Sequence, residues 1–104
     1  SDENNQLNNK MKAKIMEMLG MGIWENAQDV SELHIKKADN ENLKMLNGEM
    51  ITVSEIDDHD LHINEHIAFM LGQDFENASK KNEELEKLFM QHINNHKKLN
   101  KTEG

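Results

Sequence analysis

The sequence predicts a small all-α domain, a bundle of about four helices with flexible polar termini. Apolar residues recur at intervals of three and four over several stretches, which is the period of a helix with one buried face. Apolar and polar residues alternate only over residues 49–55, a stretch too short to form a sheet by itself. The 104 residues leave room for one modest core. We therefore expect a single helical domain over residues 10–99, with polar tails at 1–9 and 100–104.

The first predicted helix spans residues 8–19 and ends at Gly20, which has no Cβ and so suits the left-handed position that follows many helices. Its apolar stripe comprises Leu7, Met11, Ile15, Met18 and Leu19. Trp24 follows in a short apolar connector, and we expect its large side chain to fill core space between helices.

The second predicted helix begins at residues 29–32 (DVSE), a capping-box pattern with an acceptor side chain three residues before a glutamate. It ends at Asn47-Gly48, although the very polar segment 36–42 allows a break in its middle. Its stripe comprises Ala27, Val30, His34, Ala38 and Met45. Residues 49–55 then form an extended linker.

The third predicted helix spans residues 57–71, with Asp57 as its N-cap and Gly72 after its last turn. Ile56 and Leu61 have the spacing of a hydrophobic staple, in which a residue before the cap packs on the first turn.

The fourth predicted helix covers residues 79–99 and has the most continuous stripe. Its members are Leu85, Leu88, Phe89, His92, Ile93, His96 and Leu99.

Composition excludes several classes of function. The chain has no cysteine, so it forms neither disulfides nor thiolate metal sites. Its net charge is -8 and every basic residue is lysine, whereas nucleic-acid readers depend on arginine for bidentate contacts. No apolar run is long enough to cross a bilayer. The serines suit caps and turns, and no glycine-rich phosphate loop occurs, so we predict that the chain is not an enzyme.

The histidines are the most specific chemical signal. His62 and His66 are four residues apart on one predicted helix, and His92 and His96 repeat that spacing on another. Two facing pairs could supply four imidazoles to a zinc ion. A dinuclear iron site of the hemerythrin kind would use the same spacing, with oxygen ligands from residues such as Glu65, Asp60 or Glu86.

A second interpretation of these histidines needs no metal. His92 and His96 lie at the centre of an apolar stripe, where neutral imidazoles can pack and hydrogen-bond to neighbours. The first predicted helix also offers no histidine to complete a hemerythrin-like ligand set. From the sequence alone we favour core histidines, with no metal and no other cofactor, and keep His62, His66, His92 and His96 as the candidate ligands.

Three segments resemble a known family. The order MLGMGIWENAQDVSELHIKKADNEN, then EIDDHDLHINEHIAFML, then HINNHKKL resembles the C-terminal region of portal proteins from tailed phages of Gram-positive bacteria. The most specific part is DDHxxHIxEHxxFML followed about thirty residues later by HIxxH. The likeness covers residues 6–99.

This resemblance implies a structural role. Portal proteins form a ring, usually of twelve subunits, at one capsid vertex, through which DNA is packaged and ejected. We therefore expect a helical, crown-like module in the virion, assembled in the bacterial cytoplasm, with other portal subunits and phage head proteins as partners. We expect neither membrane association nor tight sequence-specific nucleic-acid binding. The alternatives are a helical metal-binding domain and a helical adaptor that binds a protein partner through a methionine-rich surface.

Overall fold

The computed structural model describes residues 10–11 and 27–103, which form helices and connecting loops with no β-strand among them. The predicted all-α fold is therefore confirmed. The chain divides into two compact units, residues 1–33 and 34–104, and the second is described below. The predicted helix at 8–19 and the expected core position of Trp24 lie outside the described residues, apart from Lys10 and Met11, which are helical.

Helix α2 spans Ala27–Leu46 and is continuous through the polar segment 36–42, where the sequence allowed a break. The expected start at residues 29–32 is wrong, because the helix already includes the two residues before them. Polar residues are tolerated in the middle of α2 because several of them face a polar part of the interior, where Glu41 and Asn42 are buried.

The end of α2 is as predicted. Gly48 has a φ of 88°, in the region that favours glycine. Its N–H donates to the Met45 carbonyl at 2.8 Å, and the Glu49 N–H donates to the Lys44 carbonyl at 3.1 Å. These two bonds form a Schellman motif, which satisfies the last carbonyls of the helix and turns the chain into the extended segment that follows.

Helix α3 spans His59–Met70, and its N-cap lies one residue later than predicted. Asp58, not Asp57, is the N-cap, and its side chain accepts from the Leu61 N–H at 3.1 Å. Asp57 is instead buried, because it pairs with the Lys37 ammonium and accepts from the Ser54 N–H at 3.0 Å.

The predicted hydrophobic staple is also wrong. Ile56 is 82% exposed, so it does not pack on the first turn of α3. The reason is the turn closed by the Asp57 N–H and the Ser54 carbonyl at 3.1 Å, which directs Asp57 inward and leaves Ile56 outside.

The predicted fourth helix is two helices in the structure, α4 at Gln73–Lys81 and α5 at Glu84–Glu103. Gly72 has a φ of -91° and is the N-cap position of α4, rather than a left-handed residue after α3. Asn82 separates the two helices, since its backbone is extended and its side chain accepts from the Glu84 N–H at 3.0 Å. Helix α5 continues four residues beyond the predicted end at Leu99.

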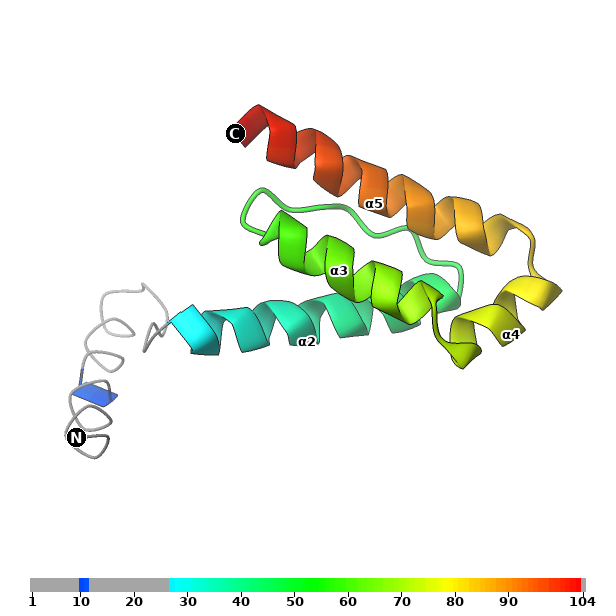
Figure 1. The fold of residues 1–104 in the computed structure, drawn as a ribbon, viewed down its shortest axis with the longest axis horizontal. Coiled ribbons are helices and arrows are strands. Elements are labelled where there is room, and N and C mark those ends of the chain that lie inside the picture. The colour runs from blue at the N-terminus through cyan, green and yellow to red at the C-terminus, as the bar shows by residue number, and fades with distance from the viewer. Residues whose placement is uncertain (1–9, 12–26, 104) are drawn as a thin grey trace. The chain divides into compact units, whose positions relative to one another are not determined.

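The helices enclose an interior with two chemically different parts. Figure 1 shows α3 lying beside α5, with α2 along α3 and the extended segment 47–58 returning past both. Near α4 the interior is apolar, and Phe89 packs between Phe69 and Phe75 with ring centroids 5.8 and 5.0 Å away. The buried residues of this apolar core are Met45, Phe75, Leu85 and Phe89. The other part of the interior holds the histidines.

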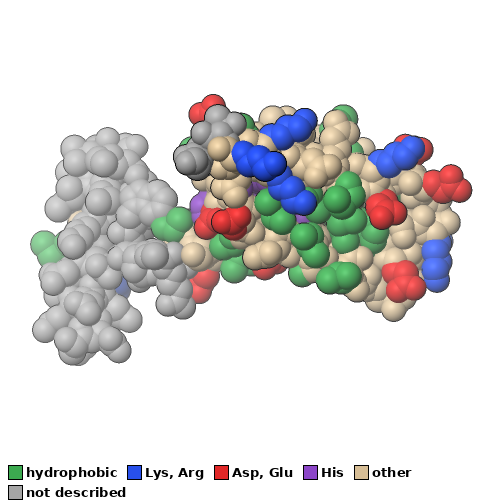
Figure 2. All heavy atoms as spheres, turned by 45° about the horizontal axis from the view of Figure 1, so that its top comes forward, with side chains coloured by type: hydrophobic (Ala, Val, Ile, Leu, Met, Phe, Trp, Pro, Cys, Tyr) green, Lys and Arg blue, Asp and Glu red, His purple; other side chains and the backbone are tan. Residues whose placement is uncertain are grey.

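Charged side chains are spread over the face shown in Figure 2, where histidine is almost entirely covered. In the part of the chain that the structure describes, no helix combines the length and the apolar character needed to cross a membrane.

Candidate metal centre

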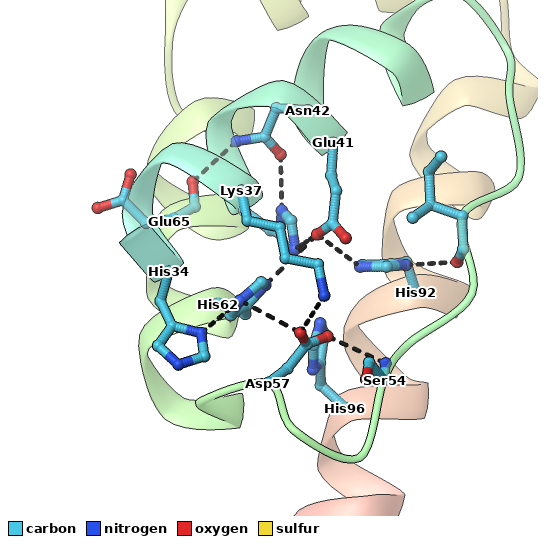
Figure 3. Close-up of polar contacts among 12 residues, drawn as sticks. His34, Lys37, Glu41, Asn42, Ser54, Asp57, His62, Glu65, His92 and His96 are labelled. Atoms are coloured by element: carbon cyan, nitrogen blue, oxygen red, sulfur yellow. Dashed lines mark hydrogen bonds and ion pairs between the residues drawn. The ribbon is translucent and has the colours of Figure 1, made fainter. Parts of the chain in front are cut away.

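All six histidines of the chain lie in one cluster where α2, α3 and α5 meet. Figure 3 shows four of them, His34, His62, His92 and His96, around Glu41. Neighbouring rings have centroids 4.7–5.8 Å apart. Glu41 and Asn42 of α2 also face the cluster, as does Asp57 of the loop between α2 and α3. We call the following five residues the inner cluster: Glu41, His62, His66, His92 and His96.

Helical spacing explains how the imidazoles converge. The pair on α3, His62 and His66, faces the pair on α5, His92 and His96, because residues four apart share a helix face. The His66 and His92 ring centroids are 4.7 Å apart, and those of His62 and His96 are 5.0 Å apart. The segments HINEH and HINNH therefore meet in space, and the structure brings together all four candidate ligands.

The inner cluster is closed to solvent, since each of its residues is 5% exposed or less. Its centre is Oε1 of Glu41, which lies 3.3 Å from Nδ1 of His62, 3.5 Å from Nε2 of His66 and 3.6 Å from Nε2 of His92. Within residues 27–103, none of these atoms has a hydrogen-bond partner, and neither does Nε2 of His96.

The opposite nitrogen of each ring is held by the protein. Nδ1–H of His66 donates to Oδ1 of Asn42 at 2.7 Å, and Nδ1–H of His92 donates to the Ile51 carbonyl at 2.8 Å. Because a neutral imidazole carries one proton, these bonds leave the Nε2 lone pairs of His66 and His92 directed into the cluster.

The other two rings follow the same rule. Nδ1 of His34 accepts from the Asp58 N–H at 3.3 Å and is therefore an acceptor. Nε2 of His62 lies 3.3 Å from the same atom and donates its proton to it. The lone pair of His62 is then on Nδ1, which faces the inner cluster. Nδ1 of His96 and Nδ1 of His59 are 2.9 Å apart. Every inner imidazole is thus oriented from outside by a neighbouring protein group, as metal-ligating histidines almost always are.

The charge states suit cation binding. Burial alone would raise the pKa of Glu41, but the imidazoles of His62, His66 and His92 around it hold that pKa far below its usual range. Burial lowers the pKa of His66, and Glu41 offsets only part of this effect. Burial and the neighbouring imidazoles lower the pKa of His96 to about 3. At neutral pH the cluster therefore contains an ionised Glu41 carboxylate together with the neutral rings of His66 and His96.

Such an arrangement lacks a positive charge at its centre. A buried carboxylate needs hydrogen-bond donors or a cation to offset its desolvation, and a bound cation would do so where the rings present lone pairs. The distances of 3.3–3.6 Å between Oε1 of Glu41 and the three imidazole nitrogens are longer than most hydrogen bonds. They match the separation of about 3.3 Å between ligands that follows from tetrahedral bonds of about 2.0 Å to zinc. Ligand atoms of Glu41, His62, His66 and His96 all lie within 4.8 Å of one another.

The oxygen ligands suggested by the sequence lie elsewhere. Asp60 is exposed and accepts from the Asn100 side chain at 2.9 Å. Glu86 is exposed, and Glu65 faces Asp39; burial and this neighbouring carboxyl raise the Glu65 pKa. The carboxylates that do reach the cluster are Glu41 and Asp57.

Glu41 was missed although the sequence contains a signal for it. His34, Ala38 and Met45 form the buried stripe of α2, and a spacing of four, three and four residues places Glu41 on the same face. A glutamate at a core position of an otherwise apolar stripe needs a positive partner, which is the argument that identifies it.

No protein-family model, curated protein or solved structure matches this chain. Fold and site together define a small all-α module with a buried histidine–carboxylate cluster.

Proposed function

We propose that this chain is a structural metal-binding module. Its inner cluster binds one divalent first-row transition ion, zinc or iron, through the four imidazoles and Glu41. The observation that carries the proposal is a set of buried side-chain atoms without hydrogen-bond partners: Oε1 of Glu41, with nitrogens of His62, His66 and His92 3.3–3.6 Å from it, and Nε2 of His96, which shares a compact ligand group with Glu41, His62 and His66. Imidazole-rich sites suit zinc, iron, copper and nickel, and a carboxylate ligand adds the charge that a divalent ion requires.

A structural role follows from the closed surroundings. Structural metal sites use all their coordination positions for protein ligands, whereas catalytic sites keep one open to water or substrate. Here the ligands come from α2, α3 and α5, and all of them are buried. The ion would fix three helices against one another in a domain whose apolar core contains four buried residues. Its binding energy would therefore contribute directly to folding.

The test is the metal content of the tag-free protein, followed by thermal melts before and after chelation. We expect stoichiometric zinc or iron, and a large fall in melting temperature when a chelator removes it. Restoring the metal to the chelated protein should restore the melt. A protein that purifies without metal, and whose melt is unchanged when zinc or Fe²⁺ is added, would contradict the proposal.

We propose, as a second function compatible with the first, that this module belongs to a phage portal protein. The support is the resemblance of the three segments quoted above, together with one observation about them. The most specific parts of the resemblance, DDHDLHINEHIAFML and HINNH, contain five of the six clustered histidines and the buried Asp57. The most specific residues of the resemblance are thus also most of those that form the histidine cluster.

The test of this second function is the DNA that flanks the coding sequence. A terminase gene directly beside it, with a ring-forming segment encoded in the same reading frame, would support a portal module. A locus without phage head genes would overturn it and leave the metal-binding proposal untouched.

A further inference from the structure

A second group of possible ligands lies beside the inner cluster. It consists of His34, Asp57 and His62, and we call it the outer cluster. Nε2 of His62 is 3.3 Å from Nδ1 of His34 and 3.7 Å from Oδ1 of Asp57. His62 and the Asp57 carboxylate are fully buried, and His34 is half-buried. Because His34 is half-buried, the outer cluster extends nearer to the surface than the inner cluster does.

His62 belongs to both clusters. Its Nδ1 faces Glu41 of the inner cluster, and its Nε2 faces His34 and Asp57 of the outer cluster. A neutral imidazole offers a lone pair on one side only, because the other nitrogen carries the proton. A divalent ion bound at Nε2 would replace that proton, which leaves to solvent, and His62 would then bridge two ions as an imidazolate.

A positive charge already occupies the outer cluster. The Lys37 ammonium contacts Oδ1 of Asp57, the oxygen atom that would bind an ion. The Lys37 side chain is 42% exposed, so it can turn toward solvent without crossing the core. The Asp58 N–H that occupies the His34 lone pair does so at 3.3 Å, which is long for such a bond.

Charge balance favours exchange of the lysine for a metal ion. With one divalent ion, the Glu41 carboxylate leaves the inner cluster with one net positive charge. A second divalent ion is neutralised by the Asp57 carboxylate and the His62 imidazolate together. Retaining Lys37 would add an uncompensated charge at this partly buried position, so the ammonium must leave when the second ion binds.

We propose that the outer cluster binds a second divalent transition ion, with His62 as the bridge and Lys37 as the group that the ion displaces. This inference rests on the proposed function, because the first ion occupies the inner cluster. It makes the centre dinuclear, with the two ions in unequal surroundings, one enclosed by five protein ligands and one nearer the surface.

The first experiment is zinc stoichiometry of the full chain by equilibrium dialysis and elemental analysis. Wild type should bind two ions per chain at saturation, and His34→Ala should bind one. Lys37→Met removes the competing charge and should bind the second ion about tenfold more tightly or better, since the ammonium lies in contact with its ligand. His96→Ala, which changes only the inner cluster, should instead weaken the first ion. Circular dichroism checks that each variant is folded.

Copper supplies the test of the bridge. Two Cu²⁺ ions joined by an imidazolate are magnetically coupled, so doubly loaded wild type should show a reduced isolated-Cu²⁺ signal by electron paramagnetic resonance. His34→Ala should show the full signal of one isolated ion per chain. Wild type that binds a single ion, with no change in stoichiometry in His34→Ala and no gain in Lys37→Met, would overturn the second site and leave the proposed function standing. Failure of wild type to bind zinc at all would overturn both.

Discussion

Each imidazole has two nitrogens, and the inner cluster uses them for different tasks. Outward nitrogens of His66 and His92 donate to Asn42 and to the Ile51 carbonyl, which fixes both the ring orientation and the position of the proton. Inward nitrogens have lone pairs directed at the Glu41 carboxylate. This separation of tasks distinguishes a ligand set from a group of packed core histidines, in which both nitrogens would find protein partners.

Glu41→Gln tests the central ligand. The amide keeps the shape of the carboxyl but removes its charge and places a donor or a neutral acceptor among the imidazoles. We expect metal affinity to fall by about 100-fold or more, above the 10- to 100-fold typical of changes outside the first ligand shell. Competition with a chromophoric chelator measures the affinity. Glu65→Gln is the matched control, because Glu65 lies outside the cluster, and equal affinities for the two variants would remove Glu41 from the ligand set.

Asn42→Leu tests the orientation of His66. Asn42 is 1% exposed, and its Oδ1 accepts from Nδ1–H of His66 at 2.7 Å. Leucine keeps a similar volume but leaves that N–H without an acceptor, so the ring can rotate or change tautomer. We expect metal affinity to fall by about 10- to 100-fold, measured by the same competition. Asn42→Asp retains the acceptor and should recover most of the affinity, whereas equal losses in both variants would indicate a packing effect.

The histidines of the site could be predicted from their spacing, whereas spacing alone places Glu41 on the buried face of α2 without showing that this face meets the histidines. A separation of four residues fixes two side chains on one helix face whatever the fold, so His62 and His66 share a face, as do His92 and His96. Which carboxylates approach them depends on how α2 packs across α3. That packing places Glu41 at the cluster and leaves Asp60 and Glu86 exposed.

At the scale of elements, the predictions were correct where local backbone chemistry sets a helix end and wrong where tertiary contacts set it. The end of α2 at Gly48 follows from a backbone conformation that glycine adopts readily. The start of α3 was ambiguous, since Asp57 and Asp58 can each cap a helix, and tertiary pairing with Lys37 decided between them. The first turns of helix α4 were missed because the helix is short, at nine residues, and its polar sequence buries only Phe75.

Gly48→Ala tests the Schellman motif that ends α2. An added Cβ would meet no atom within 4 Å, so the cost comes from the positive φ alone. We expect a loss of about 1–2 kcal/mol in the free energy of unfolding, measured by urea denaturation of the metal-free protein. Gly48→Asn should lose less, because asparagine tolerates this region better than alanine. Equal stability of Gly48→Ala and wild type would mean that the turn rearranges.

At the scale of the whole molecule, the interior is divided between a small apolar core and a polar cluster that contains every histidine of the chain. The apolar part includes Phe89 and three further buried side chains, which is modest for a domain that must offset its chain entropy. The polar part contributes fully only when Glu41 and Asp57 are ionised and His66 and His96 are neutral. Stability should therefore depend on pH more than in a domain with an apolar interior.

The direction of that dependence follows from the pKa shifts. Burial and neighbouring rings lower the pKa of His96 from 6.5 to about 3, and burial also lowers that of His66. For Glu41 and Asp57, burial is outweighed by their partners, so both pKa values fall below 4.5 and 3.8 respectively. Each group then binds fewer protons folded than unfolded, so the free energy of unfolding must decrease as pH falls.

We expect the metal-free protein to be most stable above pH 6.5, the ordinary histidine value, and to lose stability as pH falls below it. The histidine contribution declines first, and the carboxylate contributions follow below about pH 4.5. Melts in chelator from pH 8 to pH 4 measure the effect, and each kcal/mol lost should lower the melting temperature by roughly 4–8 °C. His96→Leu removes one buried titrating ring and should make the decline shallower. A melting temperature that stays constant from pH 7 to pH 5 would show that the folded cluster binds as many protons as the unfolded chain. Its rings would then take up protons over the same pH range as unfolded histidines, which would contradict the lowered pKa values of His66 and His96.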